Sequence, residues 1–355
     1  MNPFKFGTIV DGNYFTDRHK DLKEISQLLA SDNHLILISP RRFGKSSLVL
    51  KAVKESSLPY LWLNLQNVVS VEDLASKLLR ELFRLYPIER IKHLMTHFRV
   101  TPTLSVHPLN NSLDVTFQAT SNSEVMTEDA FALIEKVSSE DKRLVVIFDE
   151  FQEILSIRKG LDKQLRSIMQ EQHNINYIMM GSQETMMTEI FERKKSPFYH
   201  FGKLMHLDKI PYPDFKEYIL NRLPNVSMAA KEQITADILD FTNLHPYYTQ
   251  QLSSEVWDMM TYGGITDEKA VTLAVEKIVQ SHDLDFERLW QTLNRTDRYV
   301  MQSVSKGIKP MQTRQMPTST LFSAIKRLMK SGYILRSKDY EIEDPFFKEW
   351  ILKAC

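Results

Sequence analysis

The chain has 355 residues, 43% of them hydrophobic and 25% charged, and its 45 basic residues balance its 45 acidic residues. This is the composition of an ordinary globular protein, and the overall charge identifies no partner. No run of about 18 apolar residues and no apolar signal core is present, so we expect neither a membrane span nor export. The single cysteine, Cys355, excludes an intrachain disulfide and a cysteine-based metal site. A cytoplasmic protein is the expectation that follows.

The first predicted element is an amphipathic helix near the start of the chain. Asp17 is a candidate N-cap for this helix. Leu22, Ile25, Leu28 and Leu29 follow at the spacing of a single helix face.

Short apolar runs, rich in β-branched or aromatic residues, recur through the first part of the chain, and helical patterns separate most of them. Strands that alternate with helices imply an α/β fold, with a parallel sheet and helices on both faces. A β-hairpin inserted at about 101–122, with Asn110-Asn111 at its turn, interrupts the alternation. The predicted strands are 34–38, 60–65, 144–148, 175–180 and 205–207, and the helices are 73–86, 127–137 and 161–172.

Strand patterns stop after about residue 208, and helical patterns replace them. A helix at 286–304, a break at Gly307 and Pro310, a helix at 319–330 and two short strands follow in the order of a winged helix. We therefore expect an α/β core at 1–207, a helical lid at 208–285 and a winged-helix domain at 286–355. The lid helices are predicted at 214–223, 228–242, 247–261 and 267–280, and the wing strands at 333–336 and 340–342.

A phosphate-binding loop is predicted between the first strand and the helix after it. The pattern Ser39-x-x-x-x-Gly44-Lys45-Ser46 matches a P-loop except at its first position, where Ser replaces Gly at a cost if that position needs a positive φ. Gly-Lys-Ser also occurs by chance, but the apolar strand before it and the apolar helix after it favour a nucleotide site. Lys45 would reach the β- and γ-phosphates, and Ser46 would ligate Mg²⁺. The predicted nucleotide-binding residues are Pro40, Arg41, Arg42, Phe43, Gly44, Lys45, Ser46 and Ser47.

Two adjacent carboxylates end the apolar run 144–148. Asp149 is predicted to hold Mg²⁺, and Glu150 to polarise the attacking water as a general base. Residues at the carboxyl end of a parallel strand face the crevice where α/β sheets bind ligands. An apolar run followed by Asp-Glu is a common pattern, and its pairing with the upstream P-loop makes it informative.

Two further catalytic candidates follow, each with an alternative reading. Ser182, after the strand 175–180, could sense the γ-phosphate and orient water, or could belong to an ordinary strand-to-loop turn. Arg193, followed by Lys194 and Lys195, could act as an arginine finger within the chain or across a subunit contact. The same three residues could instead form a solvated basic turn.

Motifs spread over nearly the whole chain point to one family. The chain resembles the archaeal-type ATPases of the STAND branch of AAA+-related P-loop proteins, and the inserted hairpin fits that family too. The motifs that carry the resemblance are Asn2-Pro3-Phe4, Phe15-x-x-Arg18, Pro40-Arg41-Arg42-x-Gly44-Lys45-Ser46, Phe148-Asp149-Glu150-Phe151-Gln152, Gly181-Ser182, Ser196-Pro197-Phe198-Tyr199, His245-Pro246-Tyr247-Tyr248 and Asp344-Pro345-Phe346-Phe347-Lys348-Glu349-Trp350.

The resemblance implies an ATPase core, a helical lid and a winged helix that use ATP binding and hydrolysis as a conformational switch. It also implies that His245 and Pro246 lie on the lid and face the nucleotide. Asn243 and Leu244 depart from the family pattern, because glycines are usual at these positions. ATP is favoured over GTP by the resemblance and by the lack of an Asn-Lys-x-Asp guanine reader.

The predicted winged helix has two interpretations. From Arg295 to Lys338 ten basic residues accompany a single acid, Asp297, so this window carries a net charge of +9. Such a patch is typical of duplex DNA binding, and it can equally be a solvated face or a surface that docks a protein. The candidate DNA contacts are Ser319, Lys326, Arg327, Lys330 and Lys338, with Thr318 and Arg336 beside them.

Our leading hypothesis is a slow Mg²⁺-dependent ATPase that acts as a switch, coupled to DNA or to a protein effector. The alternative is a DNA-binding or signalling scaffold protein in which the nucleotide is mainly structural. As a scaffold, the protein would oligomerise on ATP binding. The cofactors expected under both hypotheses are ATP and Mg²⁺.

Overall fold

The computed structural model describes residues 1–16, 18–96, 98–106, 113–117, 122–138, 143–265, 267–312, 316–336 and 339–354. Two compact units divide the chain, and each is described by itself. The sheet unit consists of His19–Ser39 and Leu48–Leu207. The helical unit consists of Met1–Arg18, Pro40–Ser47 and Asp208–Cys355. The P-loop segment therefore belongs to the helical unit, although the strand before it belongs to the sheet unit.

A parallel five-stranded sheet forms the centre of the sheet unit, and its strand order is β2-β5-β6-β1-β7. All five predicted strands are present, so the predicted α/β fold class is confirmed. Crossover connections between parallel strands require intervening helices, which is why strands and helices alternate along the sequence. The strands are β1 (Leu35–Ile38), β2 (Tyr60–Asn64), β5 (Leu144–Asp149), β6 (Ile175–Gly181) and β7 (Lys203–His206).

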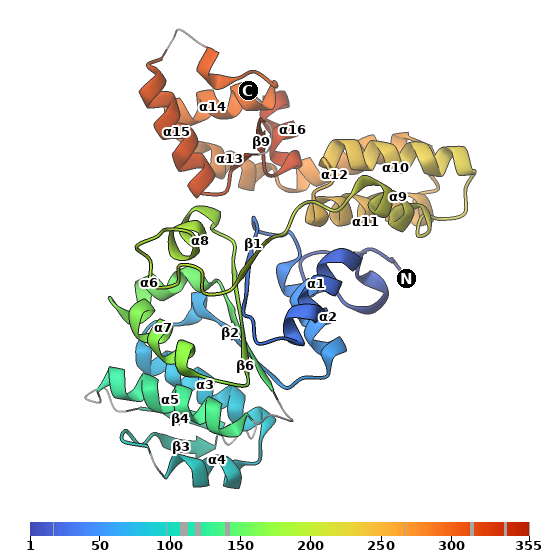
Figure 1. Ribbon diagram of the computed structural model, residues 1–355. Helices are drawn as coiled ribbons and strands as arrows, with labels where there is room; N and C mark the ends of the chain where they lie inside the picture. Colours follow the sequence, from blue (N-terminus) through green and yellow to red (C-terminus); the bar gives the residue numbers. More distant parts are fainter. Residues whose placement is uncertain are drawn as a thin grey trace. The chain divides into compact units, whose positions relative to one another are not determined.

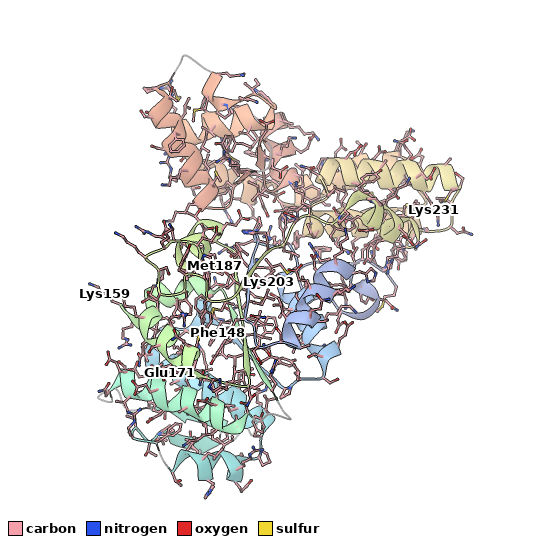
Figure 2. The ribbon with its side chains drawn as sticks, in the orientation of Figure 1. Phe148, Lys159, Glu171, Met187, Lys203 and Lys231 are labelled. Atoms are coloured by element: carbon pink, nitrogen blue, oxygen red, sulfur yellow. The ribbon has the colours of Figure 1, made fainter. Side chains whose placement is uncertain are left out.

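Helices cover both faces of this sheet (Figure 1). Alternate residues such as Ile36, Phe148 and Tyr177 pack with α3 (Val71–Leu85), α5 (Ser123–Val137) and α7 (Leu161–Glu171) in one apolar core. Residues between them on the strands point to the other face, where α1 (His19–Leu29) and α2 (Lys45–Ser56) lie. Burial of both faces explains why the strands read as continuous apolar runs. Figure 2 shows Phe148 within the core and Lys159 and Glu171 at the surface.

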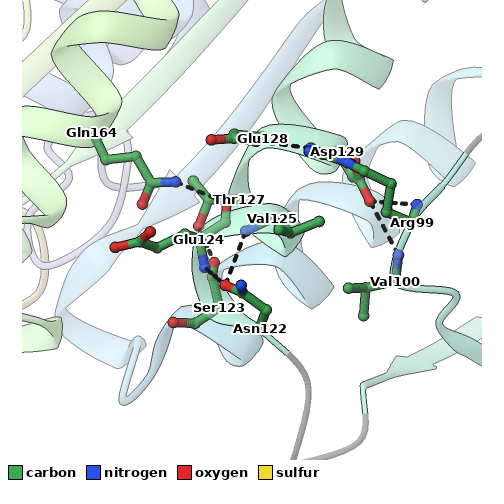
Figure 3. A network of polar contacts seen from close by, with 10 residues as sticks. All are labelled: Arg99, Val100, Asn122, Ser123, Glu124, Val125, Thr127, Glu128, Asp129 and Gln164. Carbon is green, nitrogen blue, oxygen red and sulfur yellow. Dashed lines mark hydrogen bonds and ion pairs between the residues drawn. The ribbon is translucent and has the colours of Figure 1, made fainter.

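The inserted hairpin is present as an antiparallel pair, β3 (Thr103–Val106) and β4 (Leu113–Thr116), and its predicted turn at Asn110-Asn111 lies outside the described residues. A polar network ties the chain before the hairpin to α5 (Figure 3). The buried Asp129 accepts hydrogen bonds from the backbone N–H and Nε of Arg99, at 2.8 and 2.9 Å. Asn122 caps α5 through the N–H of Glu124, at 3.0 Å. The insertion is therefore anchored near its base by charge-assisted bonds.

The helical unit contains the predicted lid and C-terminal segments, which share one apolar core. The lid helices are α9 (Tyr212–Leu220), α10 (Met228–Thr242), α11 (Pro246–Tyr262) and α12 (Lys269–Ser281). The C-terminal elements are α13 (Asp283–Thr292), α14 (Arg295–Ser305), α15 (Thr318–Lys330), β8 (Ile334–Arg336), β9 (Tyr340–Ile342) and α16 (Pro345–Ala354). The strands β8 and β9 pair antiparallel, as the predicted wing requires.

One predicted helix, at 286–304, is wrong, because two helices occupy this part of the chain. Leu293 is extended, with φ −78° and ψ 131°, and α14 begins after it. The side chain of Asn294 accepts a hydrogen bond from the N–H of Asp297 at 2.9 Å and caps the new helix. The apolar pattern runs through the break because Leu293 is itself buried in the core.

Two short helices, α4 (Ile88–Met95) and α8 (Glu184–Phe191), were not predicted from the sequence. The predicted N-cap residue Asp17 lies outside the described residues. No helix among the described residues has the length and apolar character needed to cross a membrane. The remaining short elements are η1 (Gly12–Tyr14), η2 (Leu65–Asn67), α4 (Ile88–Met95), η3 (Phe151–Glu153), α6 (Ile154–Ile157), α8 (Glu184–Phe191) and η4 (Pro310–Gln312).

Candidate nucleotide site

The P-loop follows β1 and leads directly into α2, which begins at Lys45. Gly44 has φ 88°, a conformation that glycine adopts without a steric penalty. Arg42 also lies in the left-handed region, with φ 64°. Ser39 does not, so the serine at the first motif position carries no strain of this kind. The exception to the P-loop pattern is therefore compatible with the loop geometry.

Side chains of the loop make contacts within the helical unit. The largely buried Lys45 donates from Nζ to the carbonyl oxygen of Pro40 at 3.1 Å, so its ammonium group spans the loop. The Oγ of Ser47 accepts a hydrogen bond from the N–H of Val10 at 3.0 Å. Ser47, which we predicted to bind nucleotide, thus anchors the N-terminal segment in this structure.

Arg18 holds the backbone of the P-loop through hydrogen bonds. This buried guanidinium donates from Nη2 to the carbonyl oxygens of Phe43 and Asp208, at 3.0 and 2.9 Å. One cation thus holds both the P-loop and the start of the lid segment. The Phe15-x-x-Arg18 motif marked this residue in the sequence, but the sequence indicated no role for it.

Arg42 connects the P-loop to the lid and to the C-terminal elements. Its Nη1 donates to the hydroxyl of Tyr248 on α11 at 2.9 Å, and its guanidinium lies 4.8 Å from the ring centre of Tyr247. The Tyr248 hydroxyl in turn donates to Oε2 of Glu343 at 2.7 Å. Burial raises the pKa of Tyr248, and the carboxylates of Asp344 and Glu343 add to this, so the hydroxyl keeps its proton. We call Arg42, Tyr248 and Glu343 the loop-to-lid chain.

His245 and Pro246 stand at the start of α11, beside the P-loop. The ring of His245 lies 4.8 Å from that of Phe43 in an edge-to-face arrangement. Its Nδ1 accepts a hydrogen bond from the N–H of Tyr247 at 3.2 Å, and burial lowers the pKa of the imidazole. The ring is therefore neutral with its proton on Nε2, which lies 3.4 Å from Oε1 of Glu343 without forming a good hydrogen bond.

Asp149 and Glu150 lie at the carboxyl end of β5 in the sheet unit, as predicted. The Oδ1 of Asp149 accepts a hydrogen bond from the N–H of Glu150 at 3.0 Å. Glu150 has a left-handed backbone, with φ 53° and ψ 49°, which is costly for a residue with a Cβ. Its Oε2 accepts from the Oγ of Ser182 at 2.8 Å and from Nε2 of Gln152 at 2.6 Å. The structure thus brings Ser182 to the carboxylate of Glu150.

Five further predicted site residues are exposed. Arg41 is exposed on the P-loop, and Arg193 is exposed in the turn after α8. Ser319, Lys326 and Lys330 are exposed on α15. Lys338 lies outside the described residues.

Arg327, the remaining DNA-contact candidate, is engaged in an ion pair. Its Nε donates to Oδ2 of the buried Asp297 at 3.1 Å, and its Nη2 donates to Oδ1 of the same carboxylate. The single acid in the basic window therefore neutralises one of the cations proposed for DNA.

Among the described residues no cluster of three or more His, Cys, Asp or Glu side chains could bind a metal ion. The residues of the P-loop nevertheless fit a magnesium nucleotide. Gly44 leaves open space where a Cβ would stand, and Lys45 offers the ammonium group that phosphates need. The hydroxyl of Ser46 and the carboxylate of Asp149 are hard oxygen donors of the kind that Mg²⁺ prefers.

The parallel sheet, the loop after β1 and the carboxylates after β5 together define a P-loop ATPase. The chain belongs to the family described as an ATPase domain predominantly from Archaea, which matches residues 15–234. This confirms the archaeal-type ATPase resemblance. A comparison with curated proteins finds no match.

Solved structures share the fold over nearly the whole chain. The Walker-type ATPase PABY2304 of Pyrococcus abyssi superposes with a TM-score of 0.64 at 16% identity, covering 96% of each chain. The ORC2 protein of Aeropyrum pernix, in ADPNP and ADP complexes, gives a TM-score of 0.60 at 15% identity, covering 99% of this chain and 98% of that one. The ORC1 protein of the same organism, in complex with DNA, gives 0.51 at 11% identity, covering 96% and 93%.

Proposed function

We propose that this protein is a slow, Mg²⁺-dependent, cytoplasmic ATPase that works as a conformational switch. Lys45 binds the β- and γ-phosphates, and Ser46 and Asp149 hold Mg²⁺. Glu150 orients and deprotonates the attacking water, and Ser182 fixes the carboxylate of Glu150. Bound ATP supplies the bond that is cleaved, and Mg²⁺ offsets its negative charge. His245 and Pro246 contact the nucleotide from the lid, residues 208–285, and report its state to a winged helix, residues 286–355.

The loop-to-lid chain is the observation that carries the switch proposal. Arg42 is part of the loop that would surround the phosphates, and its guanidinium is bonded to Tyr248 rather than held by its own loop. A negatively charged phosphate group near Arg42 would compete for that guanidinium. Weakening of the bond from Arg42 to Tyr248 would then free Glu343, which lies between β9 and α16. Nucleotide binding and the C-terminal elements are coupled in this way.

Hydrogen exchange in the C-terminal elements tests the switch. We expect a nonhydrolysable ATP analogue to change the exchange of residues 340–354 in the native chain. Tyr248→Phe should abolish most of this nucleotide-dependent change, because it removes the hydroxyl that joins Arg42 to Glu343. Tyr247→Phe is the matched control, since it keeps the ring under Arg42 and should respond like the native chain. An unchanged response in Tyr248→Phe would refute the coupling.

Duplex DNA binding through α15 is the second candidate function. The exposed side chains of Ser319, Lys326 and Lys330 favour it, as does the similarity in fold to an ORC1 protein that was solved with DNA. Lys326→Ala combined with Lys330→Ala should weaken binding and reduce its salt dependence by about two charges. Binding that does not respond to salt would argue for a protein effector instead.

Two further parts of the proposal concern assembly. Arg193 could act as an arginine finger in a neighbouring subunit, because it is exposed in the turn after α8. ATP-dependent oligomers, as in STAND-type switches, would then form. A molecular mass in solution that ATP leaves unchanged would exclude this arrangement.

A further inference from the structure

Gln152, the second residue after Glu150, is an unusual buried side chain. Only 1% of its surface is exposed, and its Nε2 donates to Oε2 of Glu150 at 2.6 Å. Its Oε1 has no hydrogen-bond partner among the described residues. A buried amide oxygen without a partner destabilises the folded protein. The position would therefore be more stable with an apolar side chain of similar length, and folding alone does not account for glutamine here.

The end of β6 makes room for this side chain. A Cβ on Gly181 would stand 2.6 Å from Oε1 of Gln152 and 2.3 Å from Sδ of Met187, which is too close for either. Met187 lies on α8, beside the end of the sheet (Figure 2). Gly181 does not have a positive φ, so close approach, not backbone conformation, explains the glycine. The strand end is thus shaped around the amide of Gln152.

Two residues donate to one oxygen of Glu150. Ser182, the residue after β6, donates to Oε2 from its hydroxyl at 2.8 Å and from its backbone N–H at 3.4 Å, and Gln152 on η3 donates from Nε2 at 2.6 Å. Donors fixed on one carboxylate oxygen set the plane of the carboxyl group, so the other oxygen, Oε1, has a defined direction. The left-handed backbone of Glu150 aims the side chain, and the two donors hold it there.

We propose that Gln152 is a positioning residue for Glu150. This inference rests on the proposed function, in which Glu150 is the general base. Gln152 touches neither nucleotide nor water in this role. It orients the carboxylate so that Oε1 accepts the proton of the attacking water, and a general base acts only within hydrogen-bond reach of that proton. Without the amide donor the carboxylate would rotate, and fewer bound ATP molecules would meet a correctly placed base.

Turnover and stability of Gln152→Met in the full chain separate positioning from packing. Methionine matches the length of glutamine but cannot donate to Oε2, and it removes the unpartnered oxygen. We expect kcat to fall about tenfold or more, the KM for Mg-ATP to stay within about twofold, and the melting temperature to hold or rise. An unchanged kcat, or a loss of kcat that follows a loss of stability, would overturn the proposal.

Gln172→Met is the matched control. Gln172 is also a buried glutamine of the sheet unit, but its Nε2 donates to the carbonyl of Phe131 at 2.7 Å and its Oε1 accepts from the hydroxyl of Tyr177. Its replacement should lower the melting temperature and leave kcat unchanged. If Gln152 serves catalysis and Gln172 serves folding, Gln152→Met lowers kcat without lowering the melting temperature, and Gln172→Met does the reverse.

Glu150→Gln tells the two proposals apart. If Glu150→Gln removes turnover while Gln152→Met does not lower it, only the positioning role fails. If the native chain shows no turnover that depends on Glu150, both proposals fail. The double variant should be no slower than Glu150→Gln alone, because Gln152 acts only through Glu150. A further loss in the double variant would show that Gln152 acts elsewhere.

Discussion

Acid should destabilise the sheet unit through one histidine that precedes β1. The ring of His34 stacks on Phe201 at 4.5 Å, and its Nδ1 accepts a hydrogen bond from the N–H of Tyr177 at 3.3 Å. Burial, together with a smaller effect of the nearby Arg166, lowers the pKa of His34 from 6.5 to about 4. Protonation would place a charge in this apolar position and would remove the acceptor for Tyr177.

The sign and size of the effect follow from the two pKa values. The unfolded chain binds a proton at His34 once the pH falls below 6.5, whereas the folded chain does so only near pH 4. Stability is therefore complete above pH 6.5 and is lost progressively as the pH falls toward 4. A difference of about 2.5 units corresponds to about 3 kcal/mol in full, and to about 2 kcal/mol at about pH 5. Partial exposure of the ring makes these values upper limits.

His34→Asn is the test, because the asparagine oxygen can still accept from Tyr177 and does not titrate. Hydrogen exchange of β6, corrected for the intrinsic rate, reports the opening of this unit alone. Between about pH 7.5 and pH 5 the native chain should lose up to about 2 kcal/mol of protection more than the variant. Equal losses in the two proteins would refute the burial argument.

Two further predictions concern the helical unit. Burial raises the pKa of Asp344 to about 6, and its folded pKa therefore lies above the unfolded one, so stability is lost as the pH rises through about 4 to 6. Asp344→Asn, which keeps the acceptor for the N–H of Phe346, should raise stability by about 1–3 kcal/mol in urea unfolding near neutral pH, and a loss there would contradict this. Asp297→Ala breaks the ion pair with Arg327 and should lower the free energy of unfolding by about 1–3 kcal/mol. Lys326→Ala, the control, should change it by less than about 0.5 kcal/mol. Equal effects of the two substitutions would count against a structural role for the ion pair.

Local patterns in the sequence predicted most of the fold. Apolar runs located all five strands of the sheet, and alternation and turn residues predicted the antiparallel pairs of β3 with β4 and of β8 with β9. The helix at 286–304 failed because the apolar spacing continues across the break, where a single capping residue, Asn294, decides the boundary. Short helices such as α4 and α8 offer too few turns for a clear period.

The candidate site was predictable only where its residues form a contiguous motif. Lys45, Ser46, Asp149 and Glu150 were proposed in this way, because phosphate and magnesium chemistry constrains residue type and spacing. Gln152 stood in the motif Asp-Glu-Phe-Gln, yet its contact with Glu150 depends on side-chain packing that no spacing reveals.

Contacts between residues far apart in the chain could not be predicted from the sequence either. Tyr248 and Glu343 are separated by 95 positions, and a local pattern cannot join them. Arg42 was expected to bind nucleotide, and its bond to Tyr248 is a contact that the motif does not suggest. Asn243 and Leu244 stand where the family usually has glycine, and both have a left-handed backbone, with φ 47° and 60°. The lid turn is therefore kept at a conformational cost.

The most direct test of the account is ATP turnover by the purified chain and its Glu150→Gln variant, with Mg²⁺, in the presence and absence of duplex DNA. We expect slow turnover in the native chain, and ATP binding without turnover in the variant. A turnover rate that rises with DNA would identify duplex DNA as the partner, and a turnover rate that DNA leaves unchanged would favour a protein effector. Turnover that survives in Glu150→Gln would contradict the assignment of Glu150 as the catalytic base, and with it the proposed mechanism of ATP hydrolysis.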